Sequence, residues 1–444
     1  MGRTSIELWF DFSCPFAYLA SRRAPGLPAT IDWRPMLLGG VFRGIGAGDG
    51  PMATLSPQKA RHNLHDMHRW ADLFGEPFRM PAAHPMRTVR ALRTLLALPR
   101  TSWPAAIAGI FAAYWQRGED ITRDEVIAGA LAAAGIPADE VATALARADD
   151  AEIKDELRRR TDEAIALGIF GAPAWIARRP EGPPILVWGQ DRLPWVEAIL
   201  DGWDPEVEPP PGGPRPLRVR EPAVAGAAVA GAAVPGAAVD VYFDASSPFS
   251  YLALTQLPAL AAAGAAVRLR PILVGGLFRD VGQANVPLLA FPPAKLRYVS
   301  LEMARWARWW GVPFAMPTKF PQRTVAAQRL ALLAADQDFE AGHRLALALA
   351  RAMWAEQRDL EDEATLRAIL AAEGFPADWL ARTAEPELKA RLAARTAEAR
   401  DAGAFGVPTF VVTGGAPGGP HLFWGQDRLE LVARALAGRA WAPA

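Results

Sequence analysis

The chain has 444 residues, 51% of them hydrophobic and 22% charged, and its 48 basic residues balance 48 acidic ones. This balance excludes a broad field of one sign that would bind nucleic acid or an anionic membrane. A single hydrophobic core rarely organises so many residues, so the length favours two domains. The first residues lack the apolar run of a secretory signal, and no later apolar run is long enough to cross a bilayer. We therefore expect a cytoplasmic protein.

The first half of the chain has the pattern of a small α/β domain with a long helical insertion. A proline suits the first turn of a helix, and an Ala- and Leu-rich stretch is typical of packed helices. The expected elements, in chain order, are strand 6–12, a helix beginning at Pro15, strand 30–35, several helices over 56–167, strands 174–177 and 185–188, and helix 193–200. This order predicts an α/β sheet of thioredoxin type with an inserted all-helical subdomain.

The second half of the chain repeats the first. Four segments return in the same order: 11–20 as 244–253, 34–43 as 270–279, 170–173 as 405–408, and 188–193 as 424–429. A stretch rich in Pro, Gly, Ala and Val separates the two copies and is typical of a flexible or partly extended linker. The sequence therefore predicts two tandem thioredoxin-like domains, copy one over 1–203 and copy two over 239–444, joined by a linker over 204–238.

The residue before the first helical proline differs between the copies. It is Cys14 before Pro15 in copy one and Ser247 before Pro248 in copy two. Its side chain should face unpaired backbone N–H groups and the positive end of the helix dipole, a location that favours a thiolate. Cys14 is the one cysteine of the chain, so it has no intramolecular disulfide partner, and we expect a lowered thiol pKa. The plain alternatives are that Ser247 is only a helix cap and Cys14 a small buried residue.

Several motifs resemble those of a known enzyme family. Asp-x-x-Ser-Pro-Phe-Ser-Tyr-Leu, Arg-Pro-x-Leu-x-Gly-Gly-x-Phe, Phe-Gly-Val-Pro and Trp-Gly-Gln-Asp-Arg-Leu are similar to 2-hydroxychromene-2-carboxylate isomerase, which groups with kappa-class glutathione transferases in the DsbA-like superfamily. The resemblance covers nearly all of both copies and leaves out the linker. It implies glutathione as the cofactor and an isomerase or transferase that acts on a small aromatic or conjugated electrophile. The borrowed thiol would be the nucleophile.

The resemblance also implies which residues form the sites. Ser247 holds the glutathione sulfur, and Cys14 stands at the matching place of copy one. Pro173 and Pro408 are cis-prolines that leave the preceding backbone to pair with the tripeptide. The implied glutathione ligands are Lys59, Ala172, Pro173, Gln190, Asp191 and Arg192 in copy one, and Asn285, Lys295, Val407, Pro408, Gln426, Asp427 and Arg428 in copy two. The bland alternatives are a loop proline, a capping aspartate and a surface lysine.

The two copies are not expected to bind glutathione equally. Copy one has Asp49 where copy two has Asn285, and a carboxylate there would repel the anionic tripeptide. We therefore expect tighter binding by copy two. His62, His65 and His68 raise the question of a metal, but their spacing drifts around a helix without a partner set of cysteines or acids, so we expect no metal site.

Two other functions stay open. One is a monothiol DsbA-like thiol-disulfide oxidoreductase in which Cys14 forms a mixed disulfide and free glutathione completes turnover. The other is that one copy is a degenerate structural partner, so that the two copies pack as an intramolecular pseudo-dimer. In either case the expected partners are glutathione and a small molecule, with neither nucleic acid nor a membrane.

Overall fold

The chain divides into two compact units. The computed structural model describes residues 4–48, 50, 55–219, 231–284 and 286–441. Unit 1 consists of residues 1–54, 67–204 and 291–299, and unit 2 of residues 55–66, 205–290 and 300–444. This division differs from a simple cut through the linker, because a short segment of each copy belongs to the unit that the other copy builds.

A four-stranded mixed sheet lies at the centre of unit 1, in the strand order β2-β1-β3-β4. β1 (Ser5–Phe10) runs parallel to β2 (Ile31–Pro35) and antiparallel to β3 (Ala174–Arg178). β4 (Ile185–Trp188) completes the sheet beside β3. β1 is buried from its second residue onward, so its run of apolar side chains suits a strand that is covered on both faces.

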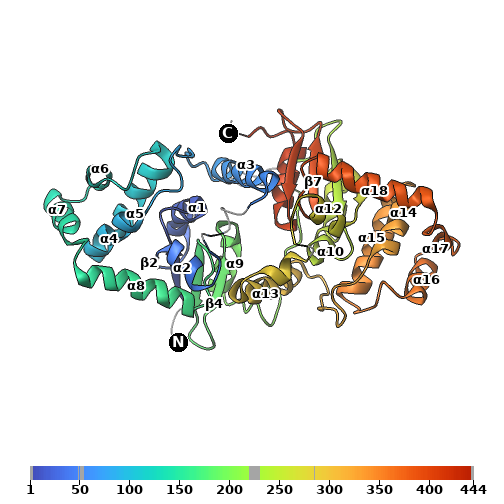
Figure 1. Ribbon diagram of the computed structural model, residues 1–444, viewed down its shortest axis with the longest axis horizontal. Helices are drawn as coiled ribbons and strands as arrows, with labels where there is room; N and C mark the ends of the chain where they lie inside the picture. The colour runs from blue at the N-terminus through green and yellow to red at the C-terminus, as the bar shows by residue number, and fades with distance from the viewer. Residues whose placement is uncertain (1–3, 49, 51–54, 220–230, 285, 442–444) are drawn as a thin grey trace. The chain divides into compact units, whose positions relative to one another are not determined.

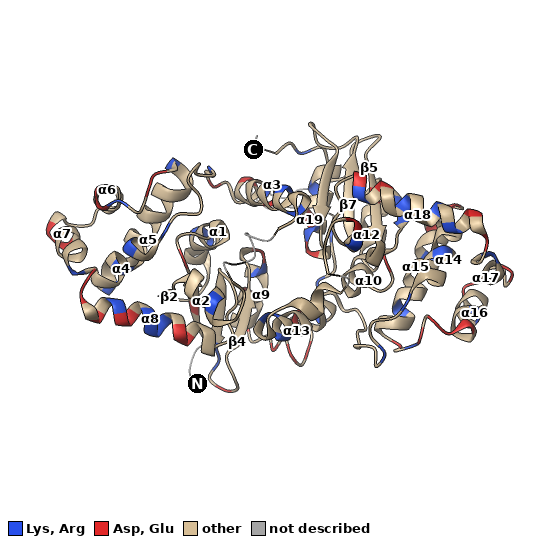
Figure 2. Cartoon of the chain, in the orientation of Figure 1, with Lys and Arg blue, Asp and Glu red and all other residues tan. Residues whose placement is uncertain are grey.

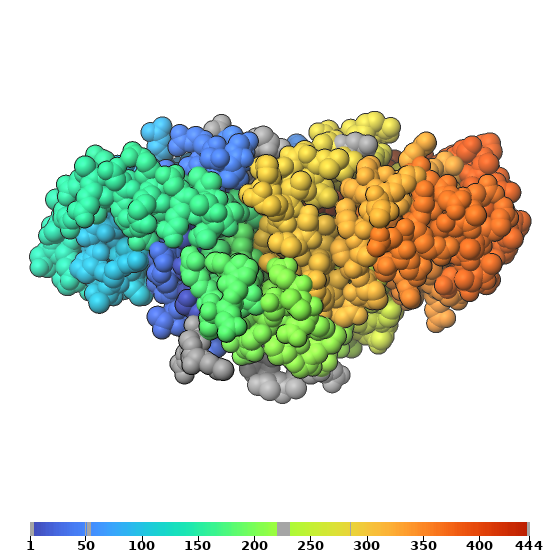
Figure 3. All heavy atoms as spheres, turned by 90° about the horizontal axis from the view of Figure 1, so that it is seen from below, coloured from blue at the N-terminus to red at the C-terminus, as the bar shows by residue number. Residues whose placement is uncertain are grey.

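Helices cover this sheet and form a separate subdomain (Figure 1). They are α1 (Pro15–Arg23), α2 (Leu38–Gly44), α4 (Val89–Ala97), α5 (Trp103–Ala112), α6 (Asp124–Ala133), α7 (Ala138–Arg147), α8 (Ala151–Ala166) and α9 (Leu193–Leu200). Helices α4 to α7 build the insertion, and α8 leads from it back to β2 and α2. In the space-filling view the side chains of the segment that contains α6 to α8 lie at the surface (Figure 3).

Helix α8 shows why an insertion so rich in charge still forms helices. Basic and acidic residues alternate along its exposed side (Figure 2), and Glu156 pairs with Arg159 at 2.8 Å and with Arg160 at 2.6 Å, one turn further on. The opposite side buries Ile153 and Leu157. An apolar stripe against the domain, ion pairs toward solvent such as that of Arg159, and the buried Arg160 pair together favour the helix.

Unit 2 repeats this architecture, with the strand order β6-β5-β7-β8. Its strands are β5 (Ala238–Phe243), β6 (Ala266–Pro271), β7 (Thr409–Thr413) and β8 (His421–Trp424). Its helices are α10 (Pro248–Leu254), α11 (Leu257–Ala262), α12 (Val274–Asp280), α14 (Val325–Ala335), α15 (Phe339–Trp354), α16 (Glu363–Ala372), α17 (Trp379–Arg382), α18 (Pro386–Asp401) and α19 (Leu429–Leu436). Two further helices, α3 (Pro57–Phe74) and α13 (Pro293–Trp310), each contribute residues to both units.

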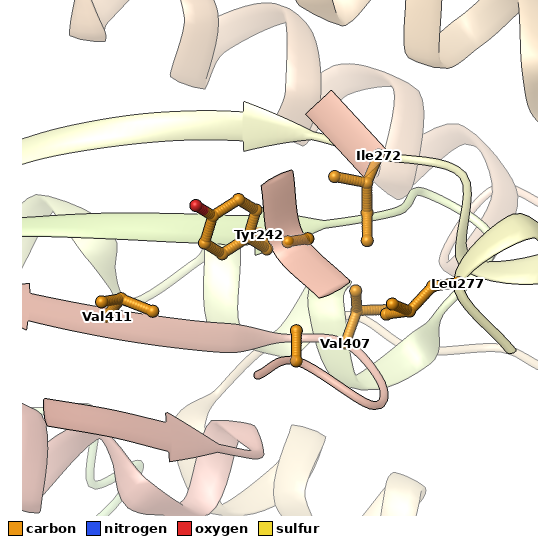
Figure 4. Close-up of a cluster of buried hydrophobic side chains, with 7 residues drawn as sticks. Tyr242, Ile272, Leu277, Val407 and Val411 are labelled. Carbon is orange, nitrogen blue, oxygen red and sulfur yellow. The ribbon is translucent and has the colours of Figure 1, made fainter. Parts of the chain in front are cut away.

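The core of unit 2 fixes the loop that precedes β7. Figure 4 shows the side chain of Val407 converging with Ile272 and Leu277 in an apolar cluster that also holds Tyr242 and Val411. Burying one such aliphatic side chain stabilises a fold by about 1.5–3 kcal/mol. Because its side chain is anchored in this core, the backbone of Val407 is held in place at the edge of the sheet.

The structure confirms the predicted fold class of two thioredoxin-like domains with helical insertions. The expected linker behaves differently in its first part, which is packed against unit 2. Arg308 donates to the carbonyl of Pro205 at 2.9 Å, and the backbone N–H of Leu217 donates to Gln256 at 2.8 Å. Across the described ranges, none of the helices combines the length and apolar character that crossing a bilayer requires.

Candidate functional site

Ser247 begins helix α10 in unit 2, directly after the turn that follows β5. Its backbone is extended, with φ −98° and ψ 121°, and Pro248 takes the first helical position. The hydroxyl accepts a hydrogen bond from the N–H of Ser250 at 3.2 Å and donates to the carbonyl of Val407 at 3.4 Å. Ser247 is therefore a helix cap, and it also touches the loop before Pro408.

A buried carboxylate fixes the turn that carries Ser247. Asp244 is 2% exposed and accepts hydrogen bonds from the N–H and the hydroxyl of Ser246, at 2.9 and 3.0 Å. It also accepts from the hydroxyl of Thr324 at 2.7 Å and the N–H of Val274 at 2.9 Å. Burial raises the pKa of Asp244. The carboxylate thus ties the turn to the starts of α12 and α14, a role that the sequence motif did not reveal.

Unit 1 repeats this arrangement around Asp11, but the Cys14 sulfur of this unit is buried. The Cys14 thiol is 7% exposed and donates to the carbonyl of Ala172 at 3.1 Å. Burial raises the pKa of Cys14 to about 12 and outweighs the N–H groups of Ala17 and Phe16, which lower it. The structure therefore contradicts the expected lowered pKa. The helix start supplies donors, but the loss of solvent around the thiolate has the larger effect.

The proline loops lie beside the Trp-Gly-Gln-Asp-Arg segments. The Ala172–Pro173 and Val407–Pro408 peptide bonds are cis. In unit 1 the N–H of Gly189 donates to the carbonyl of Pro173 at 3.0 Å, and in unit 2 the N–H of Gly425 donates to that of Pro408 at 3.0 Å. Each unit thus brings its helix start, its cis-proline and its Gln-Asp-Arg turn together.

Gly425 lets the Asp427 carboxylate fold back over the chain. Its φ is 102°, and a Cβ atom there would lie 2.5 Å from Oδ1 of Asp427. Only glycine adopts this backbone without strain and leaves that space. Gly189 and Asp191 repeat the arrangement with a φ of 111° and the same 2.5 Å. Gln426 and Gln190, beside these glycines, are 3% and 4% exposed.

The start of α3 supplies polar side chains to unit 2. The Lys59 ammonium lies 5.2 Å from the centroid of the Trp424 ring, and burial lowers its pKa. One turn further on, Nε2 of His62 accepts from the backbone N–H of Trp424 at 3.1 Å. Lys59, which the sequence paired with Cys14, therefore lies in the unit that contains Ser247.

The segment 291–299 has the matching place in unit 1. There the hydroxyl of Tyr298 accepts from the backbone N–H of Trp188 at 2.9 Å, as His62 does in unit 2. Lys295, which the sequence paired with Ser247, belongs to this segment of unit 1. The exchange of the two lysines could not be read from the repeat, because each keeps the same place along its own copy.

Two of the sequence-based assignments lie outside the described residues, Asn285 and Asp49. The expected difference in glutathione affinity that rests on them stays a prediction. Arg192 pairs with Asp191 at 2.9 Å, and Arg428 pairs with Asp427 at 3.1 Å. Within the described part of the chain, no three His, Cys, Asp or Glu side chains are grouped so as to hold a metal ion.

The fold and these sites define a thioredoxin-like protein in which a serine and a buried cysteine stand at the two helix starts. The chain belongs to the family of the DSBA-like thioredoxin domain, which matches residues 5–201 and 238–437. Both copies are therefore members of the family that the motifs indicated, and the linker lies between the two matches.

Curated relatives are enzymes of one copy's length. The chain is 28% identical over 202 residues to 2-hydroxychromene-2-carboxylate isomerase of Sphingobium xenophagum, covering 44% of this chain and 95% of that protein. It is 27% identical over 218 residues to glutathione S-transferase kappa 1 of Rattus norvegicus, covering 46% of this chain and 94% of that protein. A solved structure of 2-hydroxychromene-2-carboxylate isomerase aligns with a TM-score of 0.40 and 24% identity, over 45% of this chain and 94% of that one.

Proposed function

We propose that the protein is a glutathione-dependent isomerase or transferase of 2-hydroxychromene-2-carboxylate isomerase type, acting on a small aromatic or conjugated electrophile. The observation that carries the proposal is the Ser247 hydroxyl, which caps α10 and lies 3.4 Å from the carbonyl of Val407. A hydroxyl at this place can turn from that carbonyl to a ligand sulfur without moving the chain. The names of the relatives, isomerase and glutathione transferase, support the same class.

The residues of unit 2 fit glutathione along its length. The Asp427 carboxylate would bind the γ-glutamyl ammonium, with Gln426 on the neighbouring carboxylate. The backbone of Val407 would pair with the peptide as an added strand does. The ammonium of Lys59 would neutralise the glycyl carboxylate. Arg428 would keep Asp427 in place through their 3.1 Å ion pair.

When bound, glutathione supplies a thiol nucleophile that the chain itself lacks in unit 2. Ser247 would donate a hydrogen bond to the sulfur and so favour the thiolate. The N–H groups of the first turn of α10 would add to this effect. Asp244 would hold the turn, and with it the Ser247 hydroxyl, in a fixed position. This division of roles leaves Ser247 to set reactivity and Asp427 to set affinity.

Unit 1 repeats the cis-proline loop and the Gln-Asp-Arg turn, but the centre of its site is less favourable. Cys14 occupies the place of Ser247, and its thiol already donates to the carbonyl of Ala172. Its pKa of about 12 also weighs against the alternative of a monothiol oxidoreductase, which needs a thiolate near neutral pH. We infer that unit 1 binds glutathione more weakly and contributes little to turnover.

Calorimetry of glutathione binding to the full chain tests the proposal. Separated halves are unsuitable, because residues 55–66 and 291–299 are exchanged between the units. We expect the full chain to bind glutathione. Asp427→Ala should weaken this binding strongly, and Cys14→Ala should leave the affinity of unit 2 unchanged. A chain that binds no glutathione, or binds it only through unit 1, would overturn the proposal.

A further inference from the structure

The two indole N–H groups of the Trp-Gly-Gln-Asp-Arg motifs lie buried without a hydrogen-bond partner among the described residues. They are Nε1 of Trp424 in unit 2 and Nε1 of Trp188 in unit 1. A buried tryptophan normally finds an acceptor for this donor, because an unpaired buried donor costs free energy. The same exception at the same motif position in both copies calls for a functional explanation.

Five other buried indoles each donate to an acceptor. The pairs are Trp9 to Glu7 at 2.9 Å, Trp103 to the carbonyl of Leu98 at 3.1 Å, Trp115 to that of Phe12 at 2.8 Å, Trp175 to that of Gly189 at 3.1 Å, and Trp354 to that of Ala245 at 2.8 Å. At these five positions the fold supplies an acceptor for the indole. The Trp-Gly-Gln-Asp-Arg motif does not do so.

Both unpartnered donors lie against a glycine of the cis-proline loop. A Cβ atom at Gly406 would lie 2.7 Å from Nε1 of Trp424, and one at Gly171 would lie 2.8 Å from Nε1 of Trp188. Neither glycine has a positive φ, so the backbone does not require glycine there. Both positions require the absence of a side chain, because this absence leaves space for the indole N–H beside the backbone just before Val407 or Ala172.

Packing holds the Trp424 ring in this orientation. The ring of Phe405 lies 4.9 Å away between centroids, and the Lys59 ammonium approaches to 5.2 Å. The backbone N–H of Trp424 is bonded to His62, as described above. A rigidly held donor loses little entropy when it meets a ligand, so it can contribute to binding at small cost.

We propose that the Trp424 and Trp188 indoles are glutathione-binding residues, each donating its N–H to a carbonyl oxygen of the tripeptide that pairs with the adjoining loop. The inference rests on the proposed function. An indole N–H donates only, so its partner must be an acceptor. Glycine before Val407 and before Ala172 is then part of the site, because it makes room for that contact.

The test follows the indole N–H resonances of the full chain by NMR while glutathione is added. Trp424→Phe and Trp188→Phe assign the two signals by their absence. We expect each to move downfield as its own site fills. The titration curve of each signal then gives the affinity of each unit in the intact chain.

The variants give a second, independent readout. Trp424→Phe keeps an aromatic ring and removes the donor, so glutathione should bind to unit 2 about three- to tenfold more weakly, as the loss of one hydrogen bond implies. Gly406→Ala should weaken binding at least as much, because the added Cβ displaces the indole. Trp188→Phe is the matched control and should leave unit 2 unchanged.

The outcomes separate the two proposals. If the wild-type chain binds no glutathione, the proposed function fails and the inference with it. If glutathione binds but the Trp424 resonance stays in place, or Trp424→Phe binds with wild-type affinity, the indoles are packing residues and only the inference is overturned. The shift of the resonance is read in the wild type, and the variants are needed there only to assign the two signals.

Discussion

Arg428 of the Gln-Asp-Arg turn forms a bidentate ion pair with Asp66 of helix α3, although the two residues are 362 positions apart in the sequence. Nε of the guanidinium lies 3.0 Å from Oδ1 and Nη2 lies 2.9 Å from Oδ2. Both side chains are largely buried, at 14% and 4% exposure. The pair fixes the first half of α3 within unit 2 and holds the turn that carries Asp427.

Asp66→Asn should destabilise the fold. It removes one partner of a buried pair and leaves the guanidinium short of an acceptor, which costs about 3–5 kcal/mol in buried pairs. We expect the lower end of this range, because Arg428 keeps its ion pair with Asp427. We also expect weaker glutathione binding, because Asp427 is drawn toward Arg428. Calorimetric unfolding of the full chain measures the first effect. Asp155→Asn, which removes an exposed ion pair with Arg158, is the control and should change little. Equal stability of both variants would contradict the account.

Asp427→Asn should loosen glutathione binding without changing the reactivity of bound thiol. A hydrogen bond between charged groups contributes about 1.5–3 kcal/mol, so the dissociation constant should rise roughly tenfold or more. The pH dependence of turnover at saturating glutathione should stay as it is. Asp191→Asn is the matched change in unit 1 and should leave the unit 2 affinity intact. A shifted pH profile in Asp427→Asn would assign that carboxylate to the chemistry instead.

Cys14 should react slowly with alkylating reagents in the folded protein. Its thiolate is scarce because burial raises its pKa to about 12, against about 8.5 for a free cysteine. Since the chain has one cysteine, the rate of iodoacetamide labelling at pH 8 reports this thiol alone. Labelling should speed up by orders of magnitude in denaturant. Labelling of the folded chain at the rate of a free thiol would revive the oxidoreductase hypothesis.

His84 should make unit 1 sensitive to acid. Its Nδ1 lies 2.9 Å from the Tyr114 hydroxyl, and burial lowers its pKa below the ordinary value of about 6.5. Above that value His84 is neutral in both states. As the pH falls below it, the unfolded chain takes up the proton first, so stability is lost as the pH falls through the unfolded and then the folded pKa.

His84→Phe should reduce this loss of stability between pH 7 and 5. The variant copies Phe320, the residue at the matching place of unit 2 before the same cis-proline. It should cost about 1 kcal/mol at neutral pH, because the Tyr114 hydroxyl loses its hydrogen bond to His84 and keeps only the one from the N–H of Met86. Melting temperatures across this pH range give the comparison with the wild type. Parallel curves for the two proteins would show that His84 does not titrate in the unfolding reaction.

The sequence predicted the features of the fold that depend on short-range patterns. Strand periodicity, Pro15 and Pro248 at the helix starts and the repeated motifs together predicted the fold, and they placed Ser247 and Cys14 at the ends of the first strands. The sequence left open whether Cys14 is a reactive thiol or a small buried residue, because its burial depends on contacts such as that with the Ala172 carbonyl from the far end of the copy.

Contacts between distant segments were missed for a similar reason. Lys59 keeps the same place in its copy as Lys295, so the repeat carried no sign that the two segments are exchanged between the units. The unpartnered indole of Trp424 was also hidden, because an aromatic residue at the end of a strand ordinarily indicates packing. The glycine two residues before Pro408 was the one signal that could have suggested room for a ligand.

The central claim is that Ser247 activates glutathione, and the ultraviolet absorbance of the bound thiolate tests it most directly. Titrating the glutathione complex of the wild type and of Ser247→Ala gives the pKa of the bound thiol in each. Loss of a donor to a charged sulfur costs roughly 1.5–3 kcal/mol, so the pKa should rise by about one to two units in the variant. Turnover near neutral pH should then fall at least tenfold on this estimate, with a much smaller change in the dissociation constant. An unchanged thiol pKa in Ser247→Ala would mean that Ser247 only caps α10, and the proposed mechanism would be wrong.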